Sequence, residues 1–234
     1  MTNQRTVHPN LVREYRKTLY CSNVKGIDIK LEVGKVNKEL SNILKDKNLT
    51  TAAFLTAYNP YSEIKSVSEN EKSQIDLEED IKNLGPEFYD GDGHDPDGIW
   101  SPEKSILILG ISQQQAEILS DKYRQNAFIW LNTVDALVSL RLRVSLENLD
   151  NLEIEQWLTK VAPNLRFEIE NLSKEELTWL MTVSESELNH WLKPSQWDLN
   201  QAWPLSKPDG STMGVGTELD RMFKLVAAGL QRIV

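Results

Sequence analysis

The sequence predicts an α+β fold followed by a smaller helical domain, and three observations support this. Apolar runs of strand length recur through the first 140 residues and alternate with segments whose apolar residues have helical spacing. Paired strands stand at both ends of this region, which favours an antiparallel or mixed sheet with helices on one face. From about Val144 only helical spacing remains. We therefore expect an α+β domain over residues 1–144 and an acidic helical domain over residues 145–234.

The composition limits the classes of function. Apolar residues make up 40% of the 234 residues, enough for one large core or two modest ones. The net charge of -9 opposes a broad electrostatic contact with nucleic acid or anionic lipid. Cys21 is the only cysteine, which excludes a disulfide within the chain and a thiolate zinc cluster. No apolar run approaches the roughly 20 residues of a membrane-spanning helix, and the polar N-terminus lacks the apolar core of a secretory signal, so we expect a cytoplasmic protein.

The elements of the first domain follow from apolar spacing and from turn residues. Residues 13–22 and 27–31 are predicted to pair as antiparallel strands. A helix follows Gly34, and Ala52 to Leu55 form a buried strand that delivers polar residues to its own end. The spacing Ser68-x-x-Glu71 is a capping box, which predicts that the next helix begins near Ser68 and ends at Gly85-Pro86.

The remaining elements of this domain are strands around one helix. Residues 105–111 are apolar on both faces of the expected strand, which predicts a central position in the sheet. Ser112-x-x-Gln115 is a second capping box and opens a helix that extends through Tyr123. Residues 127–131 and 136–140 are predicted to form two further strands.

The segment Asp90 to Gly98 combines acidic residues with glycines and invites comparison with a calcium loop. That loop needs glycine at its sixth position and glutamate at its twelfth, and counting from Asp90 these positions hold Asp95 and Ser101. We therefore predict a solvated loop and no metal site. The sequence indicates no cofactor either.

Several separated motifs in the first domain occur in one order. They are Thr56-Ala57-x-Asn59-Pro60-x-Ser62, Asn70, Trp100, Glu103 and Ser105, Gly110-Ile111-Ser112, Ala116, and Tyr123-x-Gln125-Asn126-Ala127. In this pattern, roughly residues 10 to 140 resemble the bacterial family catalogued as domain of unknown function 3293. The resemblance implies a domain boundary and a set of shared polar positions, and it implies no activity.

The polar residues near the end of the strand at 52–55 form a candidate site. A proline after Asn59 favours an extended backbone at that residue. The candidate ligand-binding residues are Tyr58, Asn59, Asn70, Trp100, Glu103 and Gln125. The alternative is that these side chains satisfy backbone groups where the strands end, as buried polar groups mostly do.

Catalytic residue patterns are scarce. The three histidines, His8, His94 and His190, are widely separated, and the chain contains no phosphate-binding loop, nucleophile elbow or His-Glu-x-x-His motif. An acid/base pair that involves Glu103 stays open, as does an enzyme with its site near Asn59 and Glu103. A role without catalysis is favoured.

The second domain contains a pair of capped helices. Ser173-x-x-Glu176 and Ser184-x-x-Glu187 flank a turn at residues 181–183, and residues 172–191 resemble the helix-turn-helix of phage-repressor-type regulators. In that reading the DNA-contacting residues would be Ser184, Ser186, Asn189, His190 and Lys193. Thr178 and Thr182 depart from the alanine and glycine usual in that family.

Charge argues against DNA as the partner of this domain. Residues 145–234 carry 8 basic and 14 acidic residues, a net of -6, and Glu185 and Glu187 would face the phosphates. A protein partner is therefore favoured, and the apolar stripe of the last helix offers a face for the domain core or for a homodimer. The prediction is a non-catalytic regulatory or protein-interaction protein, with a DNA-binding regulator and an enzyme as alternatives.

Overall fold

The structure is a computed structural model, and it describes residues 5–98, 100–134, 136–150, 152–154, 156, 157, 174, 178, 181, 182 and 230–232. The chain divides into two compact units. One comprises residues 17–144 with 229–234, and the other comprises residues 1–16 with 145–228. The predicted domains, 1–144 and 145–234, stay a prediction. Among the described residues, every helix is too short or too polar to span a membrane.

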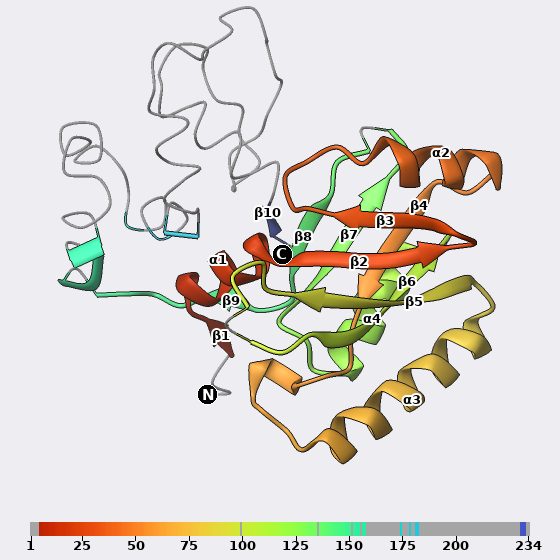
Figure 1. The fold of residues 1–234 in the computed structure, drawn as a ribbon. Coiled ribbons are helices and arrows are strands. Elements are labelled where there is room, and N and C mark those ends of the chain that lie inside the picture. Colours follow the sequence, from red (N-terminus) through yellow and green to blue (C-terminus); the bar gives the residue numbers. More distant parts are fainter. Residues whose placement is uncertain are drawn as a thin grey trace, which may run out of the picture. The chain divides into compact units, whose positions relative to one another are not determined.

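The first unit is built on one sheet, in which the seven consecutive strands from β8 to β3 are each antiparallel to the next (Figure 1). The strand order is β10-β8-β7-β4-β6-β5-β2-β3, and β10 is parallel to β8. The predicted α+β fold with an antiparallel or mixed sheet is thereby confirmed, and the predicted small all-α domain stays a prediction. The strands are β2 (Leu19–Val24), β3 (Ile27–Leu31), β4 (Thr51–Leu55), β5 (Glu87–His94), β6 (Glu103–Leu109), β7 (Ala127–Asn132), β8 (Ser139–Leu142) and β10 (Leu230–Arg232).

The centre of the sheet is formed by β4 and β6, which have buried apolar residues on both faces. Ala53 pairs with Ile108 on β6 and with Trp130 on β7, so β4 has a neighbour on each side. Residues 105 to 109 are all buried. The prediction of a central strand here is confirmed, because an apolar side chain on either face must be covered.

Two helices, α3 (Val67–Leu84) and α4 (Gln113–Lys122), cover one face of the sheet (Figure 1). Their fully buried residues include Leu77 and Ile81 of α3 and Ala116 of α4. These side chains share a core with alternate residues of the strands: Ala53, Leu55, Ile106, Ile108, Phe128 and Trp130. The helix α2 (Lys38–Asp46) lies beside β3 and apart from them, so the prediction of helices on one face holds for α3 and α4 alone.

The sheet curls, so that the segment after its edge strand β3 meets the segment that leads into β8. The backbone N–H of Gly34 donates to the Val138 carbonyl, that of Asn37 to the Ala136 carbonyl, and that of Val138 to the Lys35 carbonyl. These bonds join the segment after β3 to the segment that leads into β8. The curl gives the sheet an inner face, to which Phe54 and Leu107 belong because paired residues of antiparallel strands point to the same side.

The acidic, glycine-rich segment is a strand, and the prediction of a solvated loop over Asp90 to Gly98 was wrong for its first half. Residues 87–94 form β5 between β6 and β2. A Cβ at Gly91 would lie 2.6 Å from the Cys21 carbonyl oxygen and 2.7 Å from the Phe54 ring. Close packing on the inner face, rather than a turn, therefore requires glycine at position 91.

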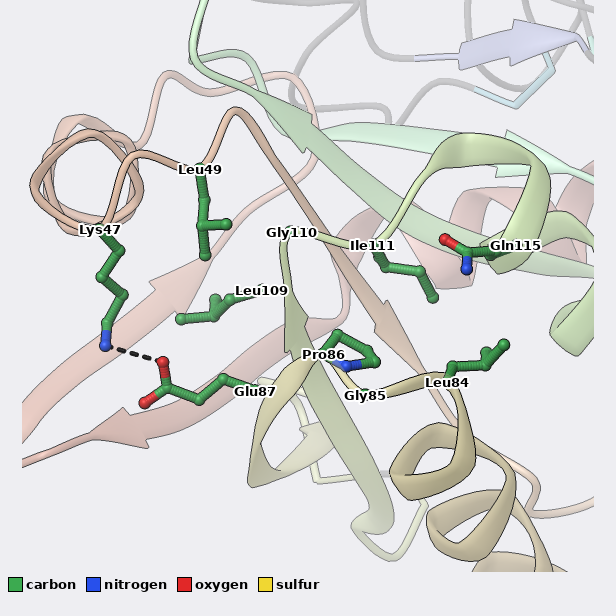
Figure 2. A pocket seen from close by; sticks show the side chains of 10 residues that line it. All are labelled: Lys47, Leu49, Leu84, Gly85, Pro86, Glu87, Leu109, Gly110, Ile111 and Gln115. Carbon is green, nitrogen blue, oxygen red and sulfur yellow. Dashed lines mark hydrogen bonds and ion pairs between the residues drawn. The ribbon is translucent and has the colours of Figure 1, made fainter.

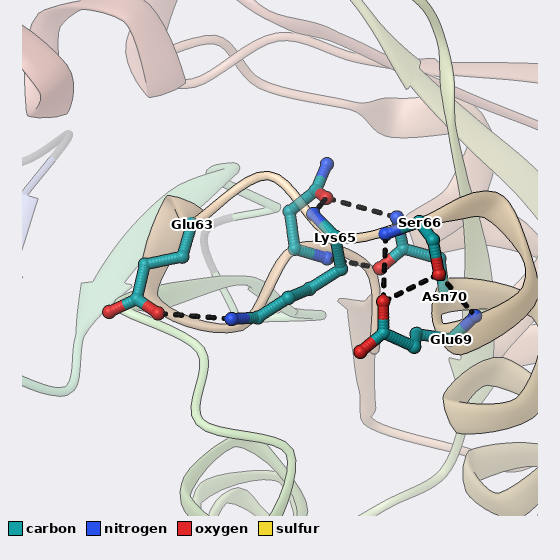
Figure 3. Close-up of polar contacts among 6 residues, drawn as sticks. Glu63, Lys65, Ser66, Glu69 and Asn70 are labelled. Carbon is teal, nitrogen blue, oxygen red and sulfur yellow. Dashed lines mark hydrogen bonds and ion pairs between the residues drawn. The ribbon is translucent and has the colours of Figure 1, made fainter.

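One of the two predicted capping boxes in this unit is displaced. The box Ser112/Gln115 opens α4 as predicted. The N-cap of α3 is Ser66 rather than Ser68, and its partner is Glu69, which accepts from the Ser66 N–H at 3.0 Å (Figure 3). Glu71, the predicted partner of Ser68, is instead held by Lys104 and Tyr58.

The other unit contains α1 (Pro9–Lys17), β1 (Thr6–Val7) and β9 (Ser145–Leu146), with β1 and β9 parallel. The predicted strand over residues 13–22 was therefore wrong for residues 13–17, which belong to the helix α1 that buries Val12 on one face. Residues 19–22 belong to β2, which pairs with β3 in antiparallel fashion as predicted. In the segment that follows β9, the Asp150 N–H donates to the Glu153 carboxylate and the Glu153 N–H donates to the Asp150 carboxylate. Most of residues 172–191 lie outside the described residues, so the helix-turn-helix stays a prediction.

Candidate functional site

A loop with an unusual backbone follows the central strand β4. Asn59, Tyr61 and Ser62 have φ values of 45°, 57° and 60°, the left-handed region that residues other than glycine rarely adopt. Pro60 to Ser62 form the single 3-10 turn η1. The predicted extended backbone at Asn59 was wrong, and asparagine tolerates the left-handed region better than most residues. Each such residue costs on the order of 1–3 kcal/mol, which the surrounding contacts must offset.

Two buried amides hold this loop. The Asn59 N–H donates to Asn70 Oδ1 at 2.8 Å, and Asn70 Nδ2 donates back to Asn59 Oδ1 at 2.9 Å. Gln125 Nε2 donates to the Tyr58 carbonyl at 3.0 Å. Asn70 is only 5% exposed and projects from the first turns of α3, next to the Ser66/Glu69 cap (Figure 3). The loop is thereby fixed from two elements, α3 and the segment before β7.

The carboxyl of Glu103 is the chemically distinctive group beside the loop. Asn59 Nδ2 donates to Glu103 Oε1 at 2.5 Å. Burial raises the pKa of Glu103, although the hydrogen bond from Asn59 acts to lower it. Among the described residues, none donates a hydrogen bond to the second oxygen, Oε2. Opposite Glu103, the paired residue of β5 is Gly93, which presents no side chain to compete for that oxygen.

Tyr58 points to the other side of β6. Its hydroxyl donates to Glu71 Oε1 at 2.9 Å, and Lys104 Nζ donates to the same carboxylate at 2.6 Å. The hydrogen bonds from Lys104 and from Tyr58 lower the pKa of Glu71. Since Glu103 and Lys104 are consecutive in a strand, they face opposite sides, and Tyr58 therefore lies on the helical side of the sheet.

The structure thus joins five of the six candidate residues through contacts of the 58–62 loop. Trp100, the sixth, is half-buried between β5 and β6 and is not part of these hydrogen bonds. Sequence reasoning missed Gln74, which is 3% exposed and whose Oε1 accepts from the Ala57 N–H at 3.0 Å. Its position four residues after Asn70 on one helical face was the signal that could have found it.

The structure gives little support to the candidate metal site and does not describe the candidate DNA-binding residues. In β5, His94 and Asp92 lie 2.7 Å apart, but within the described ranges no three His, Cys, Asp or Glu side chains converge as ligands for a metal ion. The DNA-binding candidates Ser184, Ser186, Asn189, His190 and Lys193 lie outside the described residues, so that alternative stays a prediction.

The comparisons with known proteins point to the same region. Residues 55–128 match the model of a family described as Protein of unknown function (DUF3293). The DUF3293 match covers about a third of the chain, from the end of β4 into β7, and it contains all six candidate residues. The predicted resemblance is confirmed over this segment of the wider range 10–140, and no comparison supports the helix-turn-helix resemblance. Neither curated proteins nor solved structures gave a significant match.

Proposed function

We propose that the protein is a non-catalytic binding protein with a regulatory role, and that its α+β unit binds a ligand at Glu103 and the 59–62 loop. The observation that carries the proposal is the hydrogen bond from Asn59 to Glu103 Oε1 beside three left-handed residues. Such a backbone persists only where its surroundings fix it, and fixed geometry lowers the entropy cost of binding. The segment 145–234 is proposed to contact a protein partner, because its net charge is -6.

The chemistry of the site favours a ligand that donates hydrogen bonds. Asn59 engages one oxygen of Glu103, so an incoming donor would bind the other. A carboxylate in a part-buried position binds an ammonium or a guanidinium more strongly than an exposed one does. The ligand class proposed is therefore a small organic cation.

A titration of the full chain tests this proposal. Methylguanidinium added to ¹⁵N-labelled protein should shift the Asn59 side-chain NH₂ resonances to saturation. Glu103→Gln keeps the shape of the side chain and removes its charge, so it should weaken binding roughly tenfold or more, the loss of one charge-assisted hydrogen bond. The matched control is Glu71→Gln, which removes a charge on the other side of β6 and should leave binding within about twofold. Equal weakening by both variants, or no saturation, would contradict the proposal.

An enzyme is the second candidate, and one observation favours it. Burial raises the pKa of Glu103, as is required of a carboxyl that exchanges a proton near neutral pH. Incubation of a bound cation with the full chain, followed by mass spectrometry of the recovered ligand, separates the two functions. A binding protein returns the ligand unchanged, and an enzyme returns a product whose formation Glu103→Gln abolishes.

A further inference from the structure

A hollow lies far along β6 from Glu103, where β5 begins and β6 ends (Figure 2). Its volume is about 620 Å³, within the range of small-molecule sites. Five elements surround it: the ends of α2, α3 and β6 and the starts of β5 and α4. The residues that line it are Lys47, Leu49, Leu84, Gly85, Pro86, Glu87, Leu109, Gly110, Ile111 and Gln115.

The middle of the hollow is apolar. Leu109 and Ile111 are buried, and Leu49 and Pro86 stand beside them, half-buried. Leu84, the last residue of α3, is 43% exposed at the margin. A ligand with an apolar body would cover the exposed parts of Leu84, Leu49 and Pro86, and the removal of this apolar surface from water would favour binding.

Gln115 supplies a hydrogen-bond donor on one side. Its Oε1 accepts from the Ser112 N–H at 3.0 Å and from Ser112 Oγ at 2.8 Å, as the capping box requires. The amide oxygen is therefore occupied and the orientation of the amide is fixed. Figure 2 shows the amide nitrogen turned toward the space between Ile111 and Leu84. Among the hydrogen bonds of the described residues, none uses this nitrogen as a donor.

The opposite side carries an ion pair between Lys47 and Glu87. Lys47 Nζ donates to Glu87 Oε2 at 2.7 Å (Figure 2). Lys25 lies 3.4 Å from the other Glu87 oxygen. A cation would have to displace a lysine from Glu87, and an anion would have to compete with Glu87 for Lys47 while it approached a chain of net charge -9. An uncharged ligand meets neither cost.

We infer that this hollow binds a small uncharged apolar molecule whose carbonyl oxygen accepts a hydrogen bond from Gln115 Nε2. No residue is shared with the Glu103 site, so the inference stands or fails independently of the proposed function.

Titration of the full chain with hexanamide tests the inference. The backbone amide resonances of Gly85, Gly110 and Gln115 should shift to saturation, and hexanoate and hexylammonium should bind at least about fivefold more weakly. Gln115→Glu keeps the capping acceptor and removes the donor, so it should weaken hexanamide binding about fivefold, the contribution of one neutral hydrogen bond. Gln114→Glu, on the same helix but outside the hollow, is the matched control and should change nothing.

Three outcomes would overturn the inference. Hexanamide shifts that do not saturate would exclude a site. Equal affinities of the Gln115→Glu and Gln114→Glu variants for hexanamide would exclude Gln115 Nε2 as the hydrogen-bond donor. Tighter binding of hexanoate or hexylammonium than of hexanamide would exclude an uncharged ligand. Unchanged methylguanidinium binding in Gln115→Glu would show that the failure concerns this hollow alone.

Discussion

The Phe54 ring of β4 lies against the backbone of Gly91 in β5, two strands away across the inner face of the sheet. A Cβ at Gly91 would be 2.7 Å from the ring and 2.6 Å from the Cys21 carbonyl oxygen. The Tyr20 ring meets Phe54 edge-on, with centroids 5.5 Å apart. The Tyr20 and Phe54 rings can therefore meet across the inner face only because β5 has no side chain at position 91.

Gly91→Ala is expected to destabilise the fold. The added methyl group must displace backbone as well as the ring, and overpacking of this kind costs about 1–3 kcal/mol. The free energy of unfolding, measured by urea denaturation, should fall by this amount. Gly93→Ala is the matched control on the same strand, since its Cβ would meet its nearest neighbour at an ordinary 3.5 Å. Equal effects of the two substitutions would refute the packing account.

Ser66→Ala is expected to destabilise α3 by about 1 kcal/mol, the usual cost of losing an N-cap. The hydroxyl of Ser66 accepts from the Glu69 N–H at 3.3 Å, and Glu69 accepts in return. Ser68→Ala tests the alternative box and should change the unfolding free energy by less than about 0.5 kcal/mol. A larger loss from Ser68→Ala than from Ser66→Ala would place the helix start two residues later.

Glu103→Gln is expected to raise stability at neutral pH. Burial raises the pKa of Glu103, so the folded chain holds this proton more tightly than the unfolded chain. The stability gained from the protonated form is fully present below the unfolded pKa and is lost as the pH rises through the folded pKa. The amide of the variant stays neutral and still accepts from Asn59, so its advantage over the wild type should disappear at acidic pH.

Denaturation curves of the wild type and Glu103→Gln at several pH values provide the measurement. Glu71→Gln should show the opposite sign, because the hydrogen bond from Lys104 lowers the pKa of Glu71 and its carboxylate is the stabilising form. A pH-independent difference for Glu103→Gln would rule out burial as the cause.

Glu87 is expected to titrate far below its usual range. Hydrogen bonds from Lys47 and from Tyr89, together with the charges of Lys47 and Lys25, lower its pKa from 4.5 to about 2. Its stabilising contribution is therefore present above 4.5 and is lost as the pH falls toward about 2. In Lys47→Gln the midpoint, followed by carboxyl ¹³C NMR, should move up toward 4.5. Lys25→Gln removes only the longer, 3.4 Å contact with Glu87, so it should raise the Glu87 titration midpoint less.

The sheet was predictable where local pattern and burial agree. The apolar run at 105–109 and the box Ser112/Gln115 are such cases, because each needs only neighbouring residues to be recognised. The strand at 87–94 was not, since its three acidic residues and two glycines are untypical of a strand. Only the position of Phe54, two strands away, explains why glycine is needed there. The start of α3 was ambiguous for a similar reason, because two Ser-x-x-Glu spacings overlap and the contact of Glu71 with Lys104 decides between them.

The candidate site was predictable as a set of residues but not as a geometry. Asn59 and Glu103 are 44 positions apart, and they meet because β4 and β6 are paired. The left-handed backbone at Asn59 could not be foreseen, since the local preference before proline is extended and the contacts with Asn70 and Glu103 override it.

The bonds between residues 34–37 and 136–138 have a consequence for biosynthesis. They connect positions about a hundred residues apart, and sheets that depend on such distant pairings form slowly. On the ribosome, β4 and β6 emerge well before β7, so the apolar strand Thr51–Leu55 has one unpaired margin until residue 127 has left the exit tunnel. A nascent chain at this stage exposes an aggregation-prone edge, and this is the interval in which a chaperone would protect it.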